Sequence, residues 1–147
     1  MRNFNQKEGR TPFDKYKDAL NSQLVENRKE CKVLVVGGYM DLYTYGPGLK
    51  SFGYQVVETQ TLPKAEEIQS YNAIVIHAGE EYMEKLLQDL EQTPECEHIK
   101  VLAITGAGRG RLQDIKGLNR IGDTSPKGES PADFIEKLDN LLGINRE

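Results

Sequence analysis

Short apolar runs alternate with amphipathic stretches along the chain, and this alternation predicts strands that are connected by helices. Strands are predicted at residues 32–36, 54–58, 73–76 and 101–105, and helices at 12–28, 63–70, 80–92 and 131–142. Continuous apolar strands in such an order are typical of a parallel sheet covered by helices on both faces. Because crossovers between parallel strands are right-handed, the pattern favours a doubly wound, flavodoxin-like α/β fold.

Capping signals mark the ends of the first and last helices. Thr11-Pro12-Phe13-Asp14 has the spacing of a capping box with proline in the first turn, and Ser130-Pro131 with Asp133 repeats it. The first helix precedes the first strand and has a narrow apolar stripe, formed by Phe13, Tyr16, Leu20 and Leu24. This stripe is expected to dock on the chain's own surface or on a second copy, because exposure forfeits ~1.5–3 kcal/mol for each large apolar side chain.

Length and charge limit the classes of function. The chain has 147 residues and a formal net charge of −4, which suit one domain without electrostatic attraction to nucleic acid. It has no run of about 18 apolar residues, and its first residues, MRNFNQKEGR, contain no apolar signal core. A cytoplasmic protein that binds no membrane is therefore expected. Cys31 and Cys96 lack metal-ligand spacing and are expected to be reduced structural thiols.

The predicted strands bring small or polar residues to the carboxyl edge of the sheet, where doubly wound folds hold their sites. Gly37-Gly38 follows the first strand, His77 follows the third, and Thr105-Gly106 ends the fourth. The imidazole of His77 has the chemistry to accept a phosphoryl group, to bind a metal or to act as a base. Its sequence context shows no partner, since His98 falls at the opposite end of the sheet. A hydrogen-bonded structural histidine is therefore the favoured interpretation.

Several segments together have the order and spacing of one known family. They are the apolar strand VLVV, Phe52-Gly53-Tyr54, Tyr71-Asn72, the stretch LLQDLEQTPECEHIKVLAIT that ends at Thr105, and the final SPADFIEKLDNLL. From residue 32 to about residue 143 the chain resembles the receiver domain of the response regulators of bacterial two-component signal transduction. The resemblance implies a five-stranded parallel sheet. It also divides the chain into an N-terminal extension with one amphipathic helix, residues 1–31, and a receiver-like domain, residues 32–147.

Receiver domains accept a phosphoryl group from a kinase histidine on an aspartate at the end of strand three. Two acids after strand one hold Mg²⁺, a hard ion that seeks oxygen ligands, and a Thr or Ser and a Lys contact the phosphoryl group. The resemblance puts Gly37 and Gly38 at the positions of the two acids and His77 at the acceptor position. Thr105 and Lys127 match the last two positions. The phosphorylation pocket is therefore expected to be degenerate, with neither metal nor cofactor.

These residues predict a pseudo-receiver, which is a non-enzymatic signalling or scaffold module that acts by protein–protein interaction and is not phosphorylated on aspartate. Its partner is another protein or a second copy of the chain. The alternative is a sensor of a small ligand or nucleotide, binding an anion at glycine-rich strand ends through Gly106, Gly108, Arg109 and Arg111. A Rossmann cofactor site is disfavoured, because Leu112 stands where the dinucleotide fingerprint needs its last glycine. The simpler interpretation of residues 105–112 is a surface loop whose arginines are solvated.

Tyrosines cluster after the first strand, at Tyr39, Tyr43 and Tyr45. Gly46-Pro47-Gly48 should break a helix there or delay its start to Pro47. The expected result is a tyrosine-rich loop above the former phosphorylation pocket. These tyrosines either contact a partner or pack over the sheet edge in place of the missing pocket.

Overall fold

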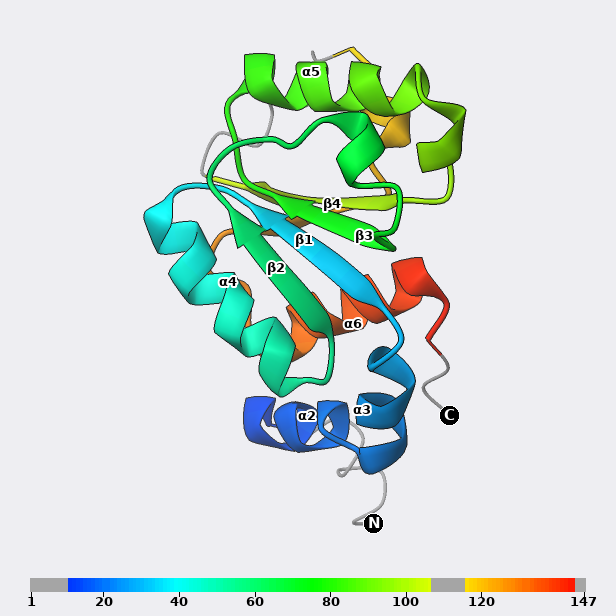
Figure 1. The fold of residues 1–147 in the computed structure, drawn as a ribbon. Coiled ribbons are helices and arrows are strands. Elements are labelled where there is room, and N and C mark those ends of the chain that lie inside the picture. The colour runs from blue at the N-terminus through cyan, green and yellow to red at the C-terminus, as the bar shows by residue number, and fades with distance from the viewer. Residues whose placement is uncertain (1–10, 107–115, 145–147) are drawn as a thin grey trace.

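A five-stranded parallel sheet forms the centre of the protein (Figure 1). The computed structural model describes residues 11–106 and 116–144. The strands are β1 (Lys32–Val36), β2 (Gln55–Thr59), β3 (Ala73–Ile76), β4 (Lys100–Thr105) and β5 (Asp123–Pro126). Every neighbouring pair is parallel, and the order across the sheet is β2-β1-β3-β4-β5. This topology confirms the predicted doubly wound, flavodoxin-like fold.

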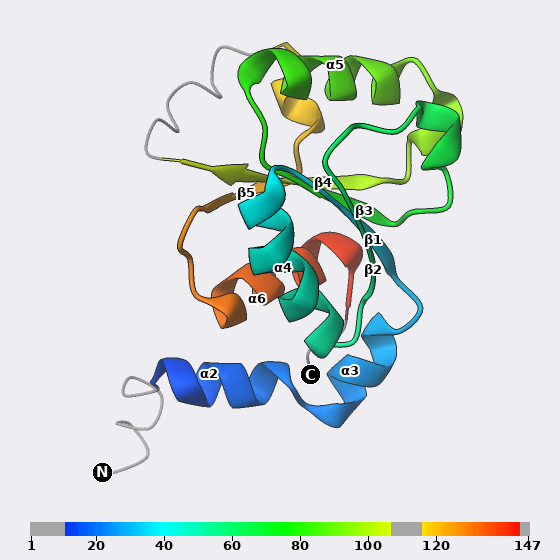
Figure 2. The ribbon, with the colours of Figure 1, turned by 60° about the vertical axis from the view of Figure 1, so that its left-hand side comes forward.

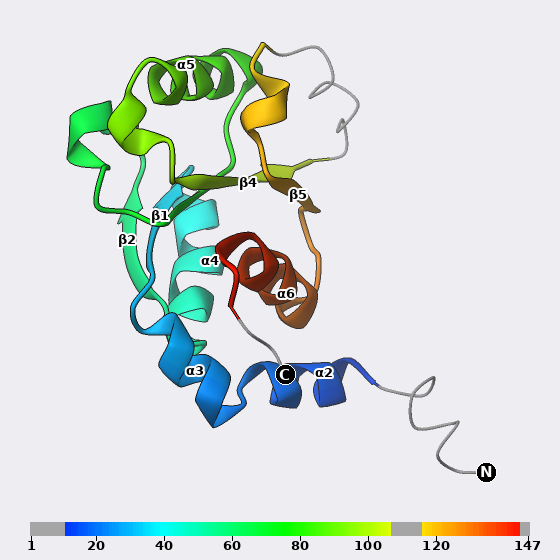
Figure 3. The same ribbon diagram turned by 90° about the vertical axis from the view of Figure 1, so that its right-hand side faces the viewer.

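Helices cover both faces of the sheet, as Figures 2 and 3 show. On one face lie α4 (Tyr39–Ser51) and α6 (Pro131–Leu142). On the other lies α5 (Glu80–Glu91) with the short 3-10 turns η1 (Ala65–Glu67), η2 (Pro94–Cys96) and η4 (Leu118–Arg120). None of the helices in the described part of the chain has the length and apolar character to cross a bilayer.

Alternate residues of each central strand point into two separate hydrophobic cores. In β1, Val33 and Val35 belong to the core beneath α4 and α6, whereas Leu34 and Val36 belong to the core beneath α5. Each such side chain is almost completely buried and contributes about 1.5–3 kcal/mol of hydrophobic free energy. Burial on both faces is the physical reason why the strand is apolar throughout.

The segment after β2 contains less helix than its sequence predicts. Instead of a helix over residues 63–70, a single 3-10 turn spans Ala65–Glu67. Only Ile68 is fully buried there, and it anchors the segment in the core beneath α5. With one large apolar anchor, the chain gains too little from burial to offset the cost of nucleating a longer helix.

The predicted single N-terminal helix is wrong, because two helices occupy that region. They are α2 (Pro12–Ala19) and α3 (Ser22–Arg28). The carboxamide oxygen of Asn21 accepts hydrogen bonds from the amides of Gln23 at 2.8 Å and Leu24 at 3.4 Å, and so starts the second helix. An asparagine side chain that caps a new helix competes with continuation of the old one. The capping box at the start of α2 is confirmed.

The break between α2 and α3 also changes which residues dock. Leu24 is buried as predicted, but Phe13 is 65% exposed. Among the residues of α2 whose burial the structure describes, 13–19, Ala19 is the fully buried one. The ring of Tyr16 meets that of Phe52 edge-on, with 5.6 Å between the centroids. The predicted stripe assumed one uninterrupted helical phase, and the break at Asn21 removes that phase.

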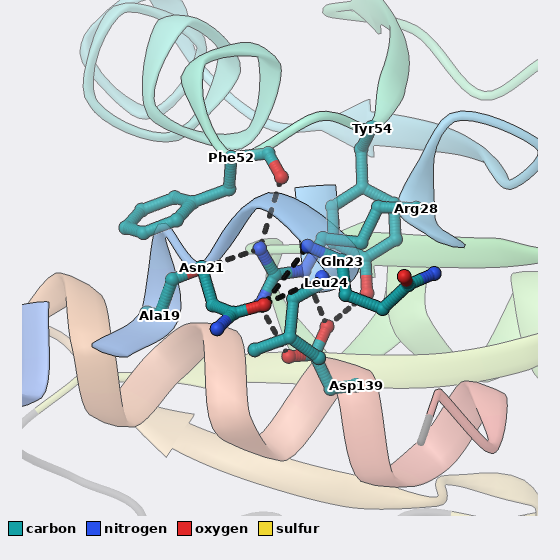
Figure 4. A network of polar contacts seen from close by, with 8 residues as sticks. All are labelled: Ala19, Asn21, Gln23, Leu24, Arg28, Phe52, Tyr54 and Asp139. Atoms are coloured by element: carbon teal, nitrogen blue, oxygen red, sulfur yellow. Dashed lines mark hydrogen bonds and ion pairs between the residues drawn. The ribbon is translucent and has the colours of Figure 1, made fainter. Parts of the chain in front are cut away.

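A buried ion pair ties the N-terminal helices to the rest of the protein (Figure 4). The side chains of Arg28 and Asp139 are both 0% exposed, and the guanidinium donates to both carboxylate oxygens, at 2.9 and 2.6 Å. Arg28 also donates to the carbonyls of Ala19 at 2.7 Å and Phe52 at 3.0 Å. The hydroxyl of Tyr54 donates to Asp139 at 2.5 Å. Burial raises the pKa of this hydroxyl, and the Asp139 carboxylate raises it further. The division of the chain at residue 31 remains a prediction.

Candidate functional site

The carboxyl edge of the sheet brings the predicted pocket positions together. The amide of His77 donates to the carbonyl of Val36 at 3.0 Å, which sets the end of β3 beside the end of β1. The amide of Lys127 donates to the carbonyl of Thr105 at 2.7 Å, which joins the ends of β4 and β5. Parallel pairing therefore gathers strand ends that lie far apart in the sequence.

Asp41 and His77 form a pair at this edge. Nδ1 of His77 lies 2.8 Å from Oδ1 of Asp41, and Oδ2 of Asp41 accepts a hydrogen bond from the amide of Gly38 at 3.0 Å. The two side chains are largely buried, with 12% of Asp41 and 27% of His77 exposed. His77 thus has the partner that its sequence context did not reveal. Asp41 stands three residues beyond Gly38, at the third position of the helix that Gly38 caps, and this spacing lets its side chain lean toward the strand ends, but its pairing with His77 was not predicted.

Gly37 makes room for this pair. A Cβ atom at position 37 would lie 2.8 Å from Cβ and 2.9 Å from Oδ2 of Asp41, which is closer than real contacts allow. At Gly38 the nearest atom would be 3.7 Å away, an ordinary contact. Any side chain at position 37 would therefore displace Asp41, and with it the hydrogen bond to His77.

Comparison with solved structures identifies the fold that places Gly37, Asp41 and His77 at one corner of the sheet. No protein-family model and no curated protein matches the sequence. The receiver domain of a Pseudomonas aeruginosa sensor histidine kinase, with a magnesium ion in its active site cleft, matches at 16% identity and a TM-score of 0.64, over 77% of this chain and 98% of that one. A putative response regulator from Chloroflexus aurantiacus matches at 17% identity and a TM-score of 0.63, over 78% and 99%. The chain has the receiver-domain fold. A putative pilus assembly-related protein from Burkholderia pseudomallei is also similar, at 14% identity and a TM-score of 0.66, over 82% and 96%.

Thr105 and Lys127, which the sequence analysis assigned to the phosphorylation pocket, differ from each other in burial. Thr105 is buried, and its hydroxyl lies 3.5 Å from the carbonyl of Ser125, a long hydrogen bond that directs it toward β5. Lys127 and Gly106 are exposed at the same edge. The other predicted anion-binding residues lie outside the described part of the chain, namely Gly108, Arg109 and Arg111.

The group formed by Gly38, Asp41 and His77 provides few ligands for a cation. Both oxygens of Asp41 are already hydrogen-bonded within the protein. Across residues 11–106 and 116–144, no group of three or more His, Cys, Asp and Glu side chains is placed to hold a metal ion. Mg²⁺ requires several oxygen ligands in a near-octahedral arrangement. The described corner supplies one carboxylate, which the imidazole of His77 and the amide of Gly38 share.

The helix that starts at this corner is longer than predicted. The expected break at Gly46-Pro47-Gly48 is wrong, because α4 runs without interruption from Tyr39 to Ser51. Gly46 is buried, and a Cβ atom there would overlap only the carboxylate end of Glu58, an exposed side chain of β2 that is free to move aside. Pro47 lies on the exposed side. Tertiary packing and the cap at Gly38 thus overcome the unfavourable propensity of the Gly-Pro-Gly segment.

The three tyrosines separate into two groups on α4. Tyr39 and Tyr43 are each 73% exposed and project from the helix rather than from a loop. Tyr45 is half-buried, and its ring lies 5.1 Å from that of Phe134 on α6. Burial raises the pKa of the Tyr45 hydroxyl, and the carboxylates of Asp41 and Glu129 raise it further. Tyr39 and Tyr43 are therefore available for contact, whereas Tyr45 is part of the packing between α4 and α6.

Proposed function

We propose that the protein is a non-enzymatic signalling or scaffold module that has the receiver fold, acts by protein–protein contact and is not phosphorylated on aspartate. The observation that carries the proposal is the Asp41–His77 pair at the carboxyl edge of the sheet. This pair fills the corner in which a phosphorylated receiver holds its acids and its metal ion.

Neither member of the pair is suited to form an acyl phosphate. His77 occupies the acceptor position and has no carboxylate. Asp41 has a carboxylate, but its oxygens accept hydrogen bonds from His77 and Gly38, and only 12% of its side chain is exposed. Attack on a phosphoryl donor requires an accessible oxygen lone pair and a cation that neutralises the transferred group.

The alternative of an anion sensor at the same edge receives less support. Lys127 supplies an exposed positive charge there. However, Asp41 keeps a carboxylate beside His77 at this edge, and its negative charge opposes an incoming phosphate or sulfate. Exposed aromatic residues on α4 favour protein contact instead, because tyrosine provides a large and rigid contact area.

The proposal is tested by incubation of the full chain with acetyl phosphate and Mg²⁺, followed by intact mass measurement and calorimetric titration with Mg²⁺. We expect no added phosphoryl group and no Mg²⁺ binding. The variant His77→Asp restores a carboxylate at the acceptor position beside Asp41 and is the matched comparison. It should gain Mg²⁺ binding, since two carboxylates then face one another. Stoichiometric phosphorylation of the wild-type chain would refute the proposal.

A further inference from the structure

The two outer strands of the sheet, β2 and β5, have a neighbouring strand on one side only, as Figure 3 shows. In a parallel sheet, alternate residues of a strand direct their amide and carbonyl to opposite sides. Each outer strand therefore directs half of its backbone groups away from the sheet, where they form a template for a further strand. The two edges of this protein differ in how these outward groups are satisfied.

The β5 edge is closed by its own side chains. The register with β4 directs the backbone groups of Thr124 and Pro126 outward. The amide of Thr124 donates to the carboxylate of Asp123 at 2.8 Å, and the carbonyl of Thr124 accepts from Nζ of Lys137 at 2.9 Å. Pro126 has no amide hydrogen to donate. A further strand would therefore find no free backbone donor at this edge.

The β2 edge is open. The amide of Gln55 and the carbonyl of Thr59 both form hydrogen bonds on the side of β1. The alternate residues between them, Val56 and Glu58, therefore direct their amides and carbonyls away from the sheet. None of these outward groups has a hydrogen-bond partner in the described part of the chain. This strand contains no proline, and no side chain caps its outward groups as happens in β5.

Val57 lies between these outward groups, and its side chain is exposed. It pairs in register with Leu34 of β1, so both side chains are on the face of the sheet that α5 covers. Leu34 is 1% exposed, whereas Val57 is 41% exposed. On this face the segment after β2 forms only the short turn η1, and the outer strand stays partly uncovered. A strand added at the edge would bring a side chain directly beside Val57.

The opposite face of this edge is bordered by α4. A Cβ atom at Gly46 would overlap the carboxylate end of Glu58, so this side of α4 lies over the outer strand. Tyr43 and Tyr39 precede Gly46 by three and seven residues, which is the spacing of one helix face. Both tyrosines are 73% exposed. They are therefore on the side of α4 that borders the open edge, where they can contact the side chains of an added strand.

We propose that the β2 edge binds an extended segment of a partner protein, which joins the sheet as a further, antiparallel strand. The inference rests on the proposed role in protein–protein contact and identifies the class of partner. The outward groups of Val56 and Glu58 have the two-residue spacing of a strand, so only an extended chain satisfies them together. In antiparallel pairing, each of these residues exchanges both backbone hydrogen bonds with one residue of the added strand.

The side chains of β2 specify which segment fits. Opposite Glu58 the segment has lysine or arginine, since opposite charges on paired strands attract. Opposite Val57 it has a β-branched residue, and opposite Val56 an apolar one. The segment therefore reads basic, β-branched, apolar from its N-terminus. A second copy of β2 fits less well, because pairing Val57 with itself places the two Glu58 side chains at diagonal positions, where like charges repel.

The test is an NMR titration of the isotope-labelled full chain with the peptide TKVITK, whose ends are blocked. We expect saturable shifts in β2 and α4 with a dissociation constant of roughly 0.1–1 mM, because a short peptide loses conformational entropy when it is ordered. In the free chain, the amides of Val56 and Glu58 should exchange rapidly with solvent and that of Val57 slowly. The peptide should slow exchange at Val56 and Glu58.

Methylation of the peptide amides gives a matched control. In the proposed register the lysine and isoleucine amides of the KVI stretch face β2, whereas the valine amide between them faces away. N-methyl groups on that lysine and isoleucine should abolish measurable binding. A single N-methyl group on the valine should change the dissociation constant by no more than about threefold.

Charge reversal tests the basic position. Glu58→Lys should weaken binding of TKVITK by about two- to tenfold and strengthen binding of TEVITK by a similar factor. Glu136→Lys makes the same change of charge at an exposed position of α6 and should leave both affinities unchanged. Equal binding of the two peptides to wild type and Glu58→Lys would overturn the proposed register.

The inference is overturned if no saturable shift appears up to about 5 mM peptide, if the shifts lie away from β2, or if N-methylation of lysine and isoleucine has no effect. Slower exchange at Val56 and Glu58 on raising the protein concentration alone would assign the edge to a second copy, which also overturns it. Phosphorylation of the wild-type chain would refute the proposed function but leave the titration unchanged, so the two failures are distinguishable.

Discussion

Replacement of Arg28 by alanine is predicted to cause a large loss of stability. The guanidinium makes four hydrogen bonds, two to the carboxylate of Asp139 and one each to the carbonyls of Ala19 and Phe52. The ion pair is 0% exposed at both side chains, so water does not replace these bonds in the folded protein. Alanine therefore leaves Asp139 in a buried setting without its cation.

The magnitude of the loss follows from the burial. Removal of one partner from a buried ion pair costs about 3–5 kcal/mol, and each buried carbonyl that loses its donor adds to the cost. For a chain of this length, 1 kcal/mol lowers the melting temperature by about 2–4 °C. The melting temperature of Arg28→Ala should therefore fall by roughly 6–20 °C. Arg28→Lys keeps the charge but loses the forked geometry, and its loss should be intermediate.

Urea unfolding monitored by circular dichroism measures this loss. The control is the neighbouring residue Lys29, whose ion pair with Glu26 is 59% and 67% exposed. Lys29→Ala should change the free energy of unfolding by no more than about 0.5 kcal/mol, as solvated pairs contribute little. If Arg28→Ala lost no more than Lys29→Ala, the buried network that joins α3 to α6 would be refuted.

Two further predictions concern α6 and α4. The Ser130 side chain, by hydrogen bonding to the Asp133 carboxylate, lowers its pKa below 3.8, and Lys15 adds to the effect. A carboxyl whose pKa is lower in the folded chain stabilises it above pH 3.8 and stops doing so as the pH falls through the folded pKa. Asp133→Asn should therefore reduce the fall of the urea unfolding midpoint between about pH 5 and pH 2.5. Glu136→Gln removes an exposed acid of the same helix and should leave that fall closer to the wild type's. Pro47→Ala should restore an amide donor within α4 and raise the melting temperature by about 4–8 °C, and a lower value would contradict the account of α4.

The sheet was predictable from the sequence because each central strand is buried on both faces. Burial on both faces demands an unbroken apolar run, and such runs are visible without knowledge of the fold. The strand ends at Gly37, His77 and Thr105 follow directly from where those runs stop. The capped start of α6 at Ser130 was equally visible, since its signal lies within four residues.

Contacts between distant residues were not predictable in the same way. Arg28 and Asp139 are 111 residues apart, and each stands in a helix where a charged side chain is usually solvated. Asp41 and His77 are 36 residues apart. The helix over Gly46-Pro47-Gly48 was not predicted, because the local rule is sound but the packing of Leu42 and Leu49 of α4 into the core outweighs it.

The corner at Gly37, Asp41 and His77 has a consequence for the exposed face of α4. Asp41 accepts a hydrogen bond from the amide of Gly38 and contacts His77, so it fixes the first turn of α4 to the end of β3. Tyr39 and Met40 project from that same turn. In a phosphorylated receiver, groups at this corner depend on a cation and a phosphoryl group, whereas here the hydrogen bonds are internal. On the proposed function, α4 therefore presents its exposed apolar residues without any ligand, and contact with a partner protein does not depend on phosphorylation.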